Sequence, residues 1–339
     1  MNYNTEILTA DSSSIRKAAG LIKNGEVVGM PTETVYGLAA NALDESAVAK
    51  IFIAKGRPQD NPLIVHISCM EMLDGLVTAV PETAVKCAER FWPGPLTMIL
   101  PKTEKIPSAT SAGLDTVGIR MPSNKTARAL IDACGLPLAA PSANLSGSPS
   151  PTSALHVYDD MNGRIPCILD DGRCAVGVES TVISFEDDAV RLLRPGFISV
   201  SDLKEVTENV IVDKGVLDAV SQNAVVASPG MKYKHYSPNA DVIIIDGSLD
   251  SFRKYVSENS GGNTWCMTFS ESDLSGIDCP SVVYGSSDKE QARRIFDALR
   301  ELDKNGADKV FARCPQKAGV GLAVYNRLLR AAGFQVIRL

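Results

Sequence analysis

Apolar residues recur along this chain with two different spacings. A spacing of three to four residues predicts amphipathic helices, and a spacing of two predicts strands that bury one face. The helical spacing marks residues 12–23, 45–55, 82–91, 125–134, 289–304 and 322–332. Period-two spacing or a short apolar run marks strands at residues 27–28, 63–68, 96–100, 116–121, 138–140, 179–185, 191–194, 309–313 and 335–339. Ser12 or Ser13 is expected to cap the first helix.

Helices and strands alternate along the whole chain, which predicts the α/β fold class but not the order of strands in a sheet. We expect two domains, at residues 1–206 and 240–339, joined by a connector at 207–239. The second domain is smaller and is expected to be Rossmann-like. Its Gly319-Val320-Gly321 lacks the third glycine of a phosphate-binding fingerprint, so we treat it as structural.

Four polar side chains point away from the apolar face of their own predicted strand: His66, Thr116, Arg120 and Ser180. A single polar residue at such a position is usually a solvated edge residue. Four of them, with a small residue such as Gly118 among them, favour a concave polar face that is left open for a ligand. This interpretation requires that the strands share one sheet.

A run of polar residues, Thr32, Glu33 and Thr34, directly follows the first apolar strand. A polar turn is the simpler interpretation of this run alone. Four later segments also place polar residues at the ends of predicted strands, and this recurrence favours a small-molecule site. Those segments are Lys55-Gly56-Arg57-Pro58, Pro62-Leu63-Ile64-Val65-His66, Gly118-Ile119-Arg120-Met121-Pro122 and Ala140-Pro141-Ser142-Ala143-Asn144.

Composition narrows the class of protein. The chain has 339 residues, 45% hydrophobic and 22% charged, with a formal net charge of −6. This predicts a globular protein with a sizeable core, and it argues against nucleic-acid binding over the whole surface. Neither a signal-peptide pattern nor a membrane-spanning apolar run is visible, so we expect a cytoplasmic protein. Eight cysteines without a C-x-x-C pair favour reduced thiols over a zinc site.

Cations near the predicted polar face suggest an anionic substrate, either a nucleotide triphosphate or a carboxylate. They are Lys55, Arg57, Arg120 and Arg194, and arginine suits paired hydrogen bonds to either group. The chain has no G-x-x-x-x-G-K-[ST] sequence, so it is not a P-loop enzyme. Hydroxyl groups and backbone amides of a serine-rich loop are instead expected to cradle phosphates, at Ser142, Asn144, Ser146, Gly147 and Ser150.

Specific motifs then suggest a family. They are Pro31-Thr32-Glu33-Thr34-Val35-Tyr36-Gly37-Leu38, Lys55-Gly56-Arg57-Pro58, Asn61-Pro62-Leu63, Phe91-Trp92-Pro93-Gly94-Pro95-Leu96-Thr97, Arg120-Met121-Pro122, Pro141-Ser142-Ala143-Asn144, Glu179-Ser180-Thr181-Val182, Leu193-Arg194-Pro195-Gly196 and, in the connector, His235-Tyr236-Ser237-Pro238. The first domain resembles the YrdC family. Essentially the whole chain resembles the two-domain L-threonylcarbamoyladenylate synthase family, without a departure at the motif positions.

The resemblance implies a YrdC-like twisted mixed sheet and a reaction. L-threonine, bicarbonate or CO2, and ATP give threonylcarbamoyl-AMP and pyrophosphate. A partner transferase then uses the product to modify an adenosine beside the anticodon of tRNA. Mg²⁺ is expected with the ATP, without an assigned protein ligand, and direct binding of this chain to tRNA is left open.

The resemblance also implies residue roles. L-threonine is expected to contact Thr34, His66, Arg120, the backbone of Ala140, and Ser180. ATP is expected to contact Arg57, Asn61, Thr116, Ser142, Ser150, Arg194 and Tyr236, with Lys55 adding charge at the phosphates. The carbamate formed on threonine attacks the α-phosphorus in line with departing pyrophosphate, so no protein nucleophile is expected.

Two other functions are compatible with an α/β domain that carries a basic face. One is an RNA-binding module, against which stand the acidic net charge and the lack of a Lys/Arg run interleaved with aromatics. The other is a carbamoyl-adenylate-forming domain of the kind used in hydrogenase maturation, which is expected with acylphosphatase and zinc-finger segments that this chain lacks.

The connector from Ser228 to Pro238 differs from a passive linker, which is usually rich in Gly and Ser or charged. It carries aromatic side chains and long cations, and its two prolines restrict its path. We interpret it as a lid over the polar face that covers bound nucleotide, with Tyr236 touching ATP. A tether packed on the surface is the alternative.

Overall fold

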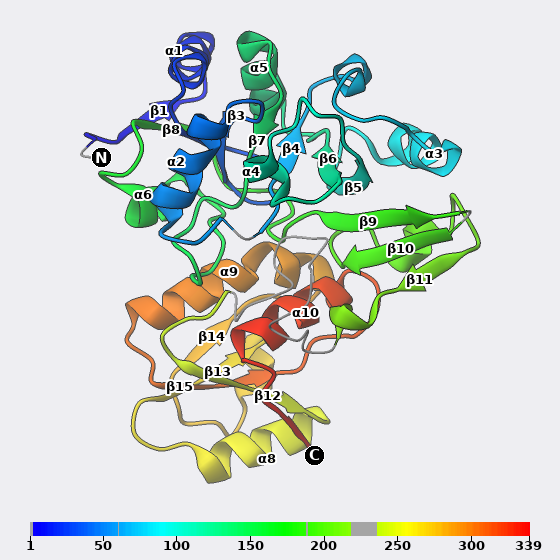
Figure 1. Cartoon of the computed structure of the whole chain (residues 1–339). Helices are drawn as coiled ribbons and strands as arrows, with labels where there is room; N and C mark the ends of the chain where they lie inside the picture. The colour runs from blue at the N-terminus through cyan, green and yellow to red at the C-terminus, as the bar shows by residue number, and fades with distance from the viewer. Residues whose placement is uncertain (1–2, 60, 188, 218–235) are drawn as a thin grey trace. The chain divides into compact units, whose positions relative to one another are not determined.

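The computed structural model describes residues 3–59, 61–187, 189–217 and 236–339 (Figure 1). The chain forms two compact units. The first comprises Met1–Ser146, Ser150–Ala175 and Glu179–Lys232, and the second comprises Gly147–Pro149, Val176–Val178 and Tyr233–Leu339. Most of the predicted lid, up to His235, lies outside the described residues, so both the lid and the boundaries 206 and 240 stay predictions.

Eleven strands in the described part of the first unit form one mixed sheet, in the order β1-β8-β2-β3-β7-β4-β6-β5-β9-β10-β11. They are β1 (Glu6–Thr9), β2 (Val28–Met30), β3 (Gly37–Asn41), β4 (Ile64–His66), β5 (Leu96–Pro101), β6 (Thr116–Arg120), β7 (Leu138–Ala139), β8 (Cys167–Asp170), β9 (Thr181–Glu186), β10 (Ala189–Arg194) and β11 (Val210–Val212). The α/β class and the mixed sheet agree with the sequence prediction.

The helices of the first unit are α1 (Ser12–Lys23), α2 (Glu45–Lys55), α3 (Glu82–Phe91), α4 (Ser108–Ser111), α5 (Lys125–Cys134), α6 (Ala154–Met161) and α7 (Val200–Leu203), with 3-10 turns η1 (Met70–Leu73) and η2 (Lys214–Val216). The predicted bounds of α1, α2, α3 and α5 are confirmed. The predicted cap of α1 is wrong, because the Asp11 carboxylate accepts from the backbone amides of Ser13 and Ser14, both at 2.8 Å.

Strand alternation divides the core of this unit between two faces of the sheet. On one face, α1 and α5 pack together against Val28 and Met30 of β2 (Figure 1). On the other face, α2, α3 and α6 contribute to a larger cluster that includes Val65 of β4 and Ile119 of β6. The neighbours His66 and Arg120 therefore point to the face that carries α1 and α5.

The described part of the second unit contains a parallel sheet of five strands, ordered β14-β13-β15-β12-β16. The strands are β12 (Asp241–Asp246), β13 (Thr264–Thr268), β14 (Ser281–Val283), β15 (Lys309–Arg313) and β16 (Val336–Arg338). The helices are α8 (Leu249–Asn259), η3 (Glu271–Leu274), α9 (Asp288–Lys304) and α10 (Gly321–Ala331). In Figure 1, α8 lies on one side of the sheet and α9 and α10 on the other, as in a Rossmann-like fold.

Candidate active site

Three polar side chains form a row across neighbouring strands of the first sheet. His66 of β4 pairs in register with Arg120 of β6, and Arg120 pairs with Thr97 of β5. Register partners project from the same face of a sheet, so the three side chains are adjacent. All three are buried, with exposed fractions of 3%, 4% and 0%. The sequence prediction that the polar faces of these strands meet in one sheet is confirmed for His66 and Arg120.

Arg120 is held on three sides. Its Nη1 donates to Oγ1 of Thr34 at 2.9 Å, its Nη2 lies 2.8 Å from Oε1 of Glu33, and its Nε lies 3.4 Å from the Gly94 carbonyl oxygen. The turn that follows β2 is itself braced, since Thr32 donates to the Val35 carbonyl at 2.6 Å. The polar run after the first strand is therefore a buried wall of this site and not a solvated turn.

Ser180 extends the row beyond Thr97. The two hydroxyl oxygens lie 2.8 Å apart, and Arg194 donates from Nη2 to Oγ of Ser180 at 3.1 Å and to its carbonyl at 3.0 Å. The chain crosses Ser180 closely at Gly196, where a Cβ atom would lie 2.3 Å from the backbone nitrogen of Thr181. Glycine at this position thus allows the Arg194–Gly196 segment to approach Ser180.

His66 is a neutral imidazole in this setting. Burial and the neighbouring charge of Arg120 lower its pKa from 6.5 to about 3. Its Nδ1 lies 3.2 Å from the Ile64 carbonyl, which only accepts hydrogen bonds, so we assign the proton of the neutral ring to Nδ1, which leaves Nε2 as the acceptor. The same carbonyl accepts from the backbone amide of Ala140 at 3.0 Å, which places Ala140 beside His66.

Lys55 is directed toward backbone oxygens of the loop after β7. Its Nζ donates to the carbonyl oxygens of Ser142 and Asn144 at 2.5 and 2.8 Å and lies 3.5 Å from Oδ1 of Asn144. Three acceptors around one amine suit a protonated ammonium group. Burial, followed by repulsion from Arg57, lowers its pKa well below the ordinary value. Lys55 therefore clamps this loop, and its predicted charge contribution at the phosphates stays a prediction.

The same loop brings together other residues that were predicted to bind nucleotide. Ser142 donates to Oδ1 of Asn144 at 2.5 Å, and Asn144 donates to the Leu145 carbonyl at 2.7 Å. Ser150 is fully buried and donates to Oε1 of Glu179 at 2.5 Å. Hydroxyl and amide groups thus converge next to Nζ of Lys55.

Four further residues predicted to bind nucleotide have surroundings of their own. The Arg57 guanidinium stacks 5.2 Å from the Phe52 ring centre, Asn61 is buried, and Thr116 begins β6, four residues before Arg120. Tyr236 belongs to the second unit. There its ring lies 5.1 Å from the Phe296 ring and 5.8 Å from the Arg327 guanidinium.

Comparison with known proteins identifies the family. Residues 20–196 match the Sua5/YciO/YrdC family, described as telomere recombination, and residues 198–333 match the C-terminal domain of threonylcarbamoyl-AMP synthase. A Pyrococcus abyssi protein named threonylcarbamoyl-AMP synthase is 46% identical over 331 residues, which cover 96% of each chain. A Bacillus subtilis protein of the same name is 46% identical over 98% of this chain and 97% of its own.

The chain belongs to the threonylcarbamoyl-AMP synthase family. A crystal structure of Pyrococcus abyssi Sua5 complexed with L-threonine agrees, with a TM-score of 0.93 and 43% identity over 99% of this chain and 100% of that one. The resemblance inferred from the motifs is thereby confirmed, as is the fold class.

Several residues of the site were not assigned a role from the sequence. Glu33 belongs to one of the family motifs. Its partner Arg120 is 87 positions away in the sequence, so no local pattern predicts their contact. Thr97 was predictable in part, because it alternates with Leu96 and Met98 on a strand whose other positions are apolar. Glu179 belongs to another family motif, and its hydrogen bond from Ser150 joins two loops that are distant in the sequence.

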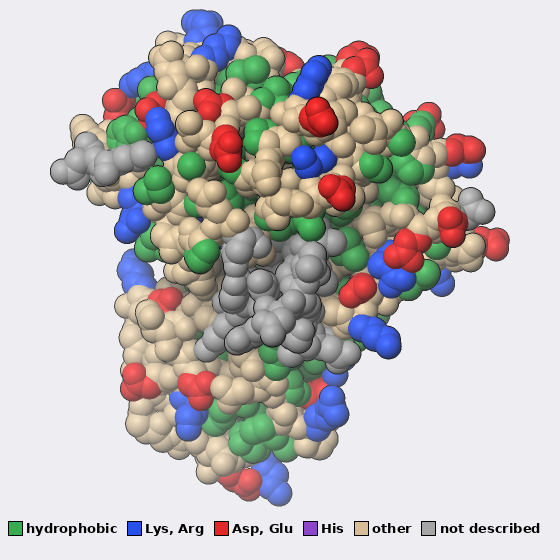
Figure 2. Space-filling view, viewed as in Figure 1, with side chains coloured by type: hydrophobic (Ala, Val, Ile, Leu, Met, Phe, Trp, Pro, Cys, Tyr) green, Lys and Arg blue, Asp and Glu red, His purple; other side chains and the backbone are tan. Residues whose placement is uncertain are grey.

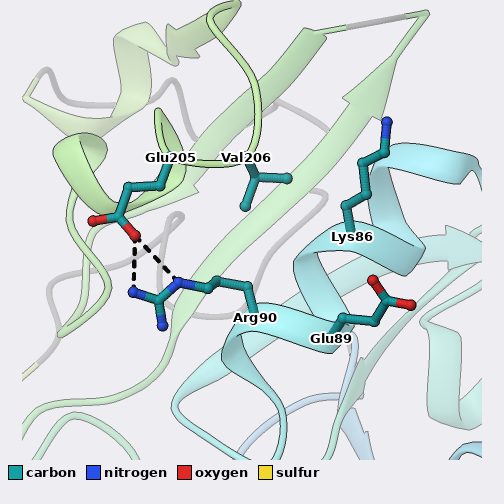
Figure 3. Close-up of a pocket in the computed structure, with 5 residues that line it drawn as sticks. All are labelled: Lys86, Glu89, Arg90, Glu205 and Val206. Carbon is teal, nitrogen blue, oxygen red and sulfur yellow. Dashed lines mark hydrogen bonds and ion pairs between the residues drawn. The ribbon is translucent and has the colours of Figure 1, made fainter.

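A separate surface pocket contains none of the residues predicted for this synthase site. It has a volume of about 350 Å³ and is lined by Lys86, Glu89, Arg90, Glu205 and Val206 (Figure 3). Figure 3 shows Arg90 crossing to Glu205, where its Nη2 lies 2.8 Å from Oε2. Both side chains are more than half exposed, so this pair contributes at most about 1 kcal/mol to stability.

Charge on the visible surface is mixed in sign. Figure 2 shows Lys and Arg side chains interspersed with Asp and Glu over the face in view. Among the described residues of that face, no continuous basic stripe of the kind expected of an RNA-binding module is seen. In the described ranges, no group of three or more His, Cys, Asp or Glu side chains is arranged to hold a metal ion. No helix of those ranges is long and apolar enough to cross a membrane.

Lowering the pH from 7 to 4 is expected to destabilise the wild type by about 3 kcal/mol more than a His66→Gln variant. The pKa of His66 is about 3 in the folded chain and 6.5 ordinarily, so below pH 6.5 the unfolded chain binds a proton that the folded chain excludes. This contribution to stability is complete above pH 6.5 and is lost as the pH falls toward 3. Denaturant unfolding at a series of pH values measures the free energy of unfolding of both proteins. An equal loss of this free energy in the wild type and in His66→Gln would contradict the prediction.

Proposed function

We propose that this chain is a nucleotidyltransferase that converts L-threonine, CO2 (from bicarbonate with loss of water) and ATP to threonylcarbamoyl-AMP and pyrophosphate. The threonine ammonium group gives up a proton, which bicarbonate takes up as it loses water to form CO2. The free amine nitrogen then bonds to the carbon of CO2 and releases a second proton to solvent, which leaves a carbamate. A carbamate oxygen then bonds to the α-phosphorus of ATP as the bond to pyrophosphate breaks. The proposal is supported by two relatives named threonylcarbamoyl-AMP synthase, each 46% identical over at least 96% of this chain.

The buried polar row is assigned to L-threonine. Arg120 donates to the carboxylate, because a guanidinium group matches its planar shape and charge. The threonine hydroxyl is assigned to Nε2 of His66 and the hydroxyl of Ser180, since a neutral imidazole accepts and a serine both donates and accepts. Thr34 and the backbone of Ala140 complete the subsite. The Pyrococcus abyssi relative whose crystal structure holds L-threonine supports this choice of ligand.

The loop clamped by Lys55 is assigned to ATP. Its hydroxyl and amide groups are donors of the kind that bind phosphate oxygens. The proposed nucleotide residues of the first unit are Lys55, Arg57, Asn61, Thr116, Ser142, Asn144, Ser150 and Arg194. The role of Tyr236, in the second unit, stays a prediction from the resemblance. Arg194 bonds to Ser180 in this structure, so it links the proposed nucleotide residues to the proposed threonine subsite.

Positioning and charge neutralisation are the proposed sources of catalysis. Attack of a carbamate on phosphorus joins two anions, so cations must offset their repulsion and hold the reacting atoms in line. The carbamate itself is the nucleophile, and no covalent enzyme intermediate is needed. Burial of the polar row also limits the water that would hydrolyse the mixed anhydride product.

Mg²⁺ is proposed to accompany the ATP. No cluster of three acidic, His or Cys side chains occurs in the described ranges, so the triphosphate and water would supply most ligands, as is usual for this ion. Glu179, which is buried and accepts a hydrogen bond from Ser150, is the carboxylate that we propose as a protein ligand. When bound, the ion neutralises phosphate charge.

The product is proposed to pass to a tRNA threonylcarbamoyl transferase, because a mixed anhydride is an activated group donor that hydrolyses in water. Since ATP, threonine and tRNA occur together in the cytoplasm, the chain is proposed to act there.

Incubation with ATP, Mg²⁺, L-threonine and ¹³C-bicarbonate tests the reaction itself. Mass spectrometry is expected to find threonylcarbamoyl-AMP that carries the ¹³C label, together with pyrophosphate. Formation of ADP and phosphate instead, or of an adenylate without the label, would contradict the proposal.

A further inference from the structure

Glu33 is a buried carboxylate with an unusual environment. Its side chain is 8% exposed, and Oε1 lies 2.8 Å from Nη2 of Arg120, which is 4% exposed. Besides Arg120, the donors near its oxygens in the described ranges are the backbone amides of Ser123 and of Glu33 itself, and neither makes a hydrogen bond of full geometry. Burial raises the pKa of Glu33, but the charge of Arg120 and the nearby amides of Ser123 and Glu33 outweigh this and lower it overall. Glu33 is therefore ionised, with acceptor capacity to spare.

A buried ionised carboxylate is costly unless donors satisfy it. Arg120 offsets the charge of Glu33 but does not use up its lone pairs, and its own donors are directed to Thr34 and Gly94 as well. Since His66 is neutral, the pair of Arg120 and Glu33 carries a formal charge of zero. A subsite with one buried cation and one buried anion matches a zwitterion better than it matches a simple carboxylate.

We propose that Glu33 determines the specificity of this subsite for a free α-amino group, by accepting hydrogen bonds from the ammonium group of the amino acid while Arg120 binds its carboxylate. This inference rests on the proposed function and names a further substrate-binding residue for it. An acid that lacks the amino group would leave Glu33 without a donor and would add a second negative charge beside it.

The proposal also predicts how the kinetic effects divide. Carbamate formation removes the positive charge of the substrate nitrogen, so the attraction to Glu33 is strongest before reaction. An interaction made mainly in the ground state affects KM more than kcat. Loss of the Glu33 charge is therefore expected to raise the KM for L-threonine and to lower kcat much less.

The test compares two ligands in the full-length chain by calorimetric titration: L-threonine and 3-hydroxybutanoate, which lacks only the amino group. The wild type is expected to bind L-threonine at least tenfold more tightly than 3-hydroxybutanoate. In Glu33→Gln, affinity for L-threonine is expected to fall about ten- to a hundredfold, while 3-hydroxybutanoate binds as well as before or better. Glu26→Gln, which removes a carboxylate paired with Lys50 at 2.8 Å, is the matched control and leaves the ratio unchanged.

An equal loss of both affinities in Glu33→Gln would overturn the proposal, because it would mean that Glu33 only positions Arg120. Unchanged affinities would overturn it as well. If the variant does not fold, the wild type still decides, since equal binding of the two ligands to the wild type contradicts the proposal. Binding of another α-amino acid in place of threonine would overturn the proposed substrate alone, and the comparison then uses that amino acid and its deaminated analogue. Binding of no amino acid would overturn both.

Discussion

An Arg120→Lys variant is expected to bind L-threonine about ten- to a hundredfold more weakly than the wild type, with an ATP affinity within about twofold. Lysine keeps the positive charge that offsets Glu33, so the fold is expected to survive. It lacks the planar fork and cannot reproduce the contacts of Arg120 with Thr34 and Glu33 at 2.9 and 2.8 Å. In the proposed subsite, the threonine carboxylate would then lose the paired hydrogen bonds that only a guanidinium group can give it. Separate calorimetric titrations with L-threonine and with ATP measure the two effects.

Arg191→Lys is the control for this change. Arg191 also pairs with a carboxylate, at 2.5 Å from Glu186, but that pair is 28% and 50% exposed. The control is expected to leave both affinities unchanged. The more severe Arg120→Ala variant is expected to cost about 3–5 kcal/mol of stability as well, since it leaves Glu33 buried without a partner. If Arg120→Lys bound threonine with normal affinity, this result would contradict the assignment of Arg120 to the threonine subsite.

A Lys55→Met variant is expected to weaken ATP binding at least tenfold and to change L-threonine binding much less. Methionine fills a similar volume but leaves the carbonyl oxygens of Ser142 and Asn144 without their donor. Each unsatisfied carbonyl costs about 1–3 kcal/mol, which the loop avoids by moving away from its present position. The hydroxyl and amide groups assigned to phosphate would move with it. The rise in melting temperature that ATP produces is expected to shrink accordingly.

Lys102→Met provides the matched control. Lys102 also donates to a backbone carbonyl, that of Ile106 at 3.0 Å, but it lies outside the loop that carries Ser142. The control is expected to retain the full ATP-dependent shift in melting temperature. Equal shifts in the wild type and Lys55→Met would contradict the clamping role of Lys55 and the assignment of this loop to ATP.

Elements with strong local signals were predictable from the sequence. The helix α5 has its apolar residues on one face, an Asn124 side chain that accepts from the Ala127 amide, and a left-handed Gly135 at its end. Each of these signals is local, so the bounds followed directly. Strand alternation likewise identified which face carries His66 and Arg120.

Other elements lacked such signals. The eight-residue helix α6 directly follows a loop rich in Ser and Pro. The strand β3 directly follows a polar turn, and it was not predicted as a separate strand. In the second unit, α8 and β13 were missed among polar residues. The order of strands depends on contacts between distant segments, such as the pairing of β5 with β9, which local periodicity does not encode.

The site residues also divide into those that the sequence predicts and contacts that it does not. Residue types and motifs pointed to Arg120 and Lys55, but the direction of each side chain depends on partners far along the chain. Arg120 meets Glu33, and Lys55 meets the carbonyl oxygens of Ser142 and Asn144 instead of being left exposed to a ligand. Such pairings are set by the packing of separate elements. The sequence therefore predicted that His66 gathers with Arg120 and that Ser142 gathers with Asn144, but not which atoms they touch. For the other predicted nucleotide residues, such as Arg57 and Asn61, the shared site stays a prediction.

The assignment as a synthase is tested by measuring pyrophosphate release from ATP in the presence of bicarbonate, with each standard amino acid in turn. We expect release that depends on L-threonine and exceeds the release with every other amino acid. Release with carbamoyl phosphate alone would indicate a carbamoyl-adenylate enzyme, and the absence of release with any amino acid would indicate a binding module. Either result would contradict the assignment of this chain as a synthase of threonylcarbamoyl-AMP.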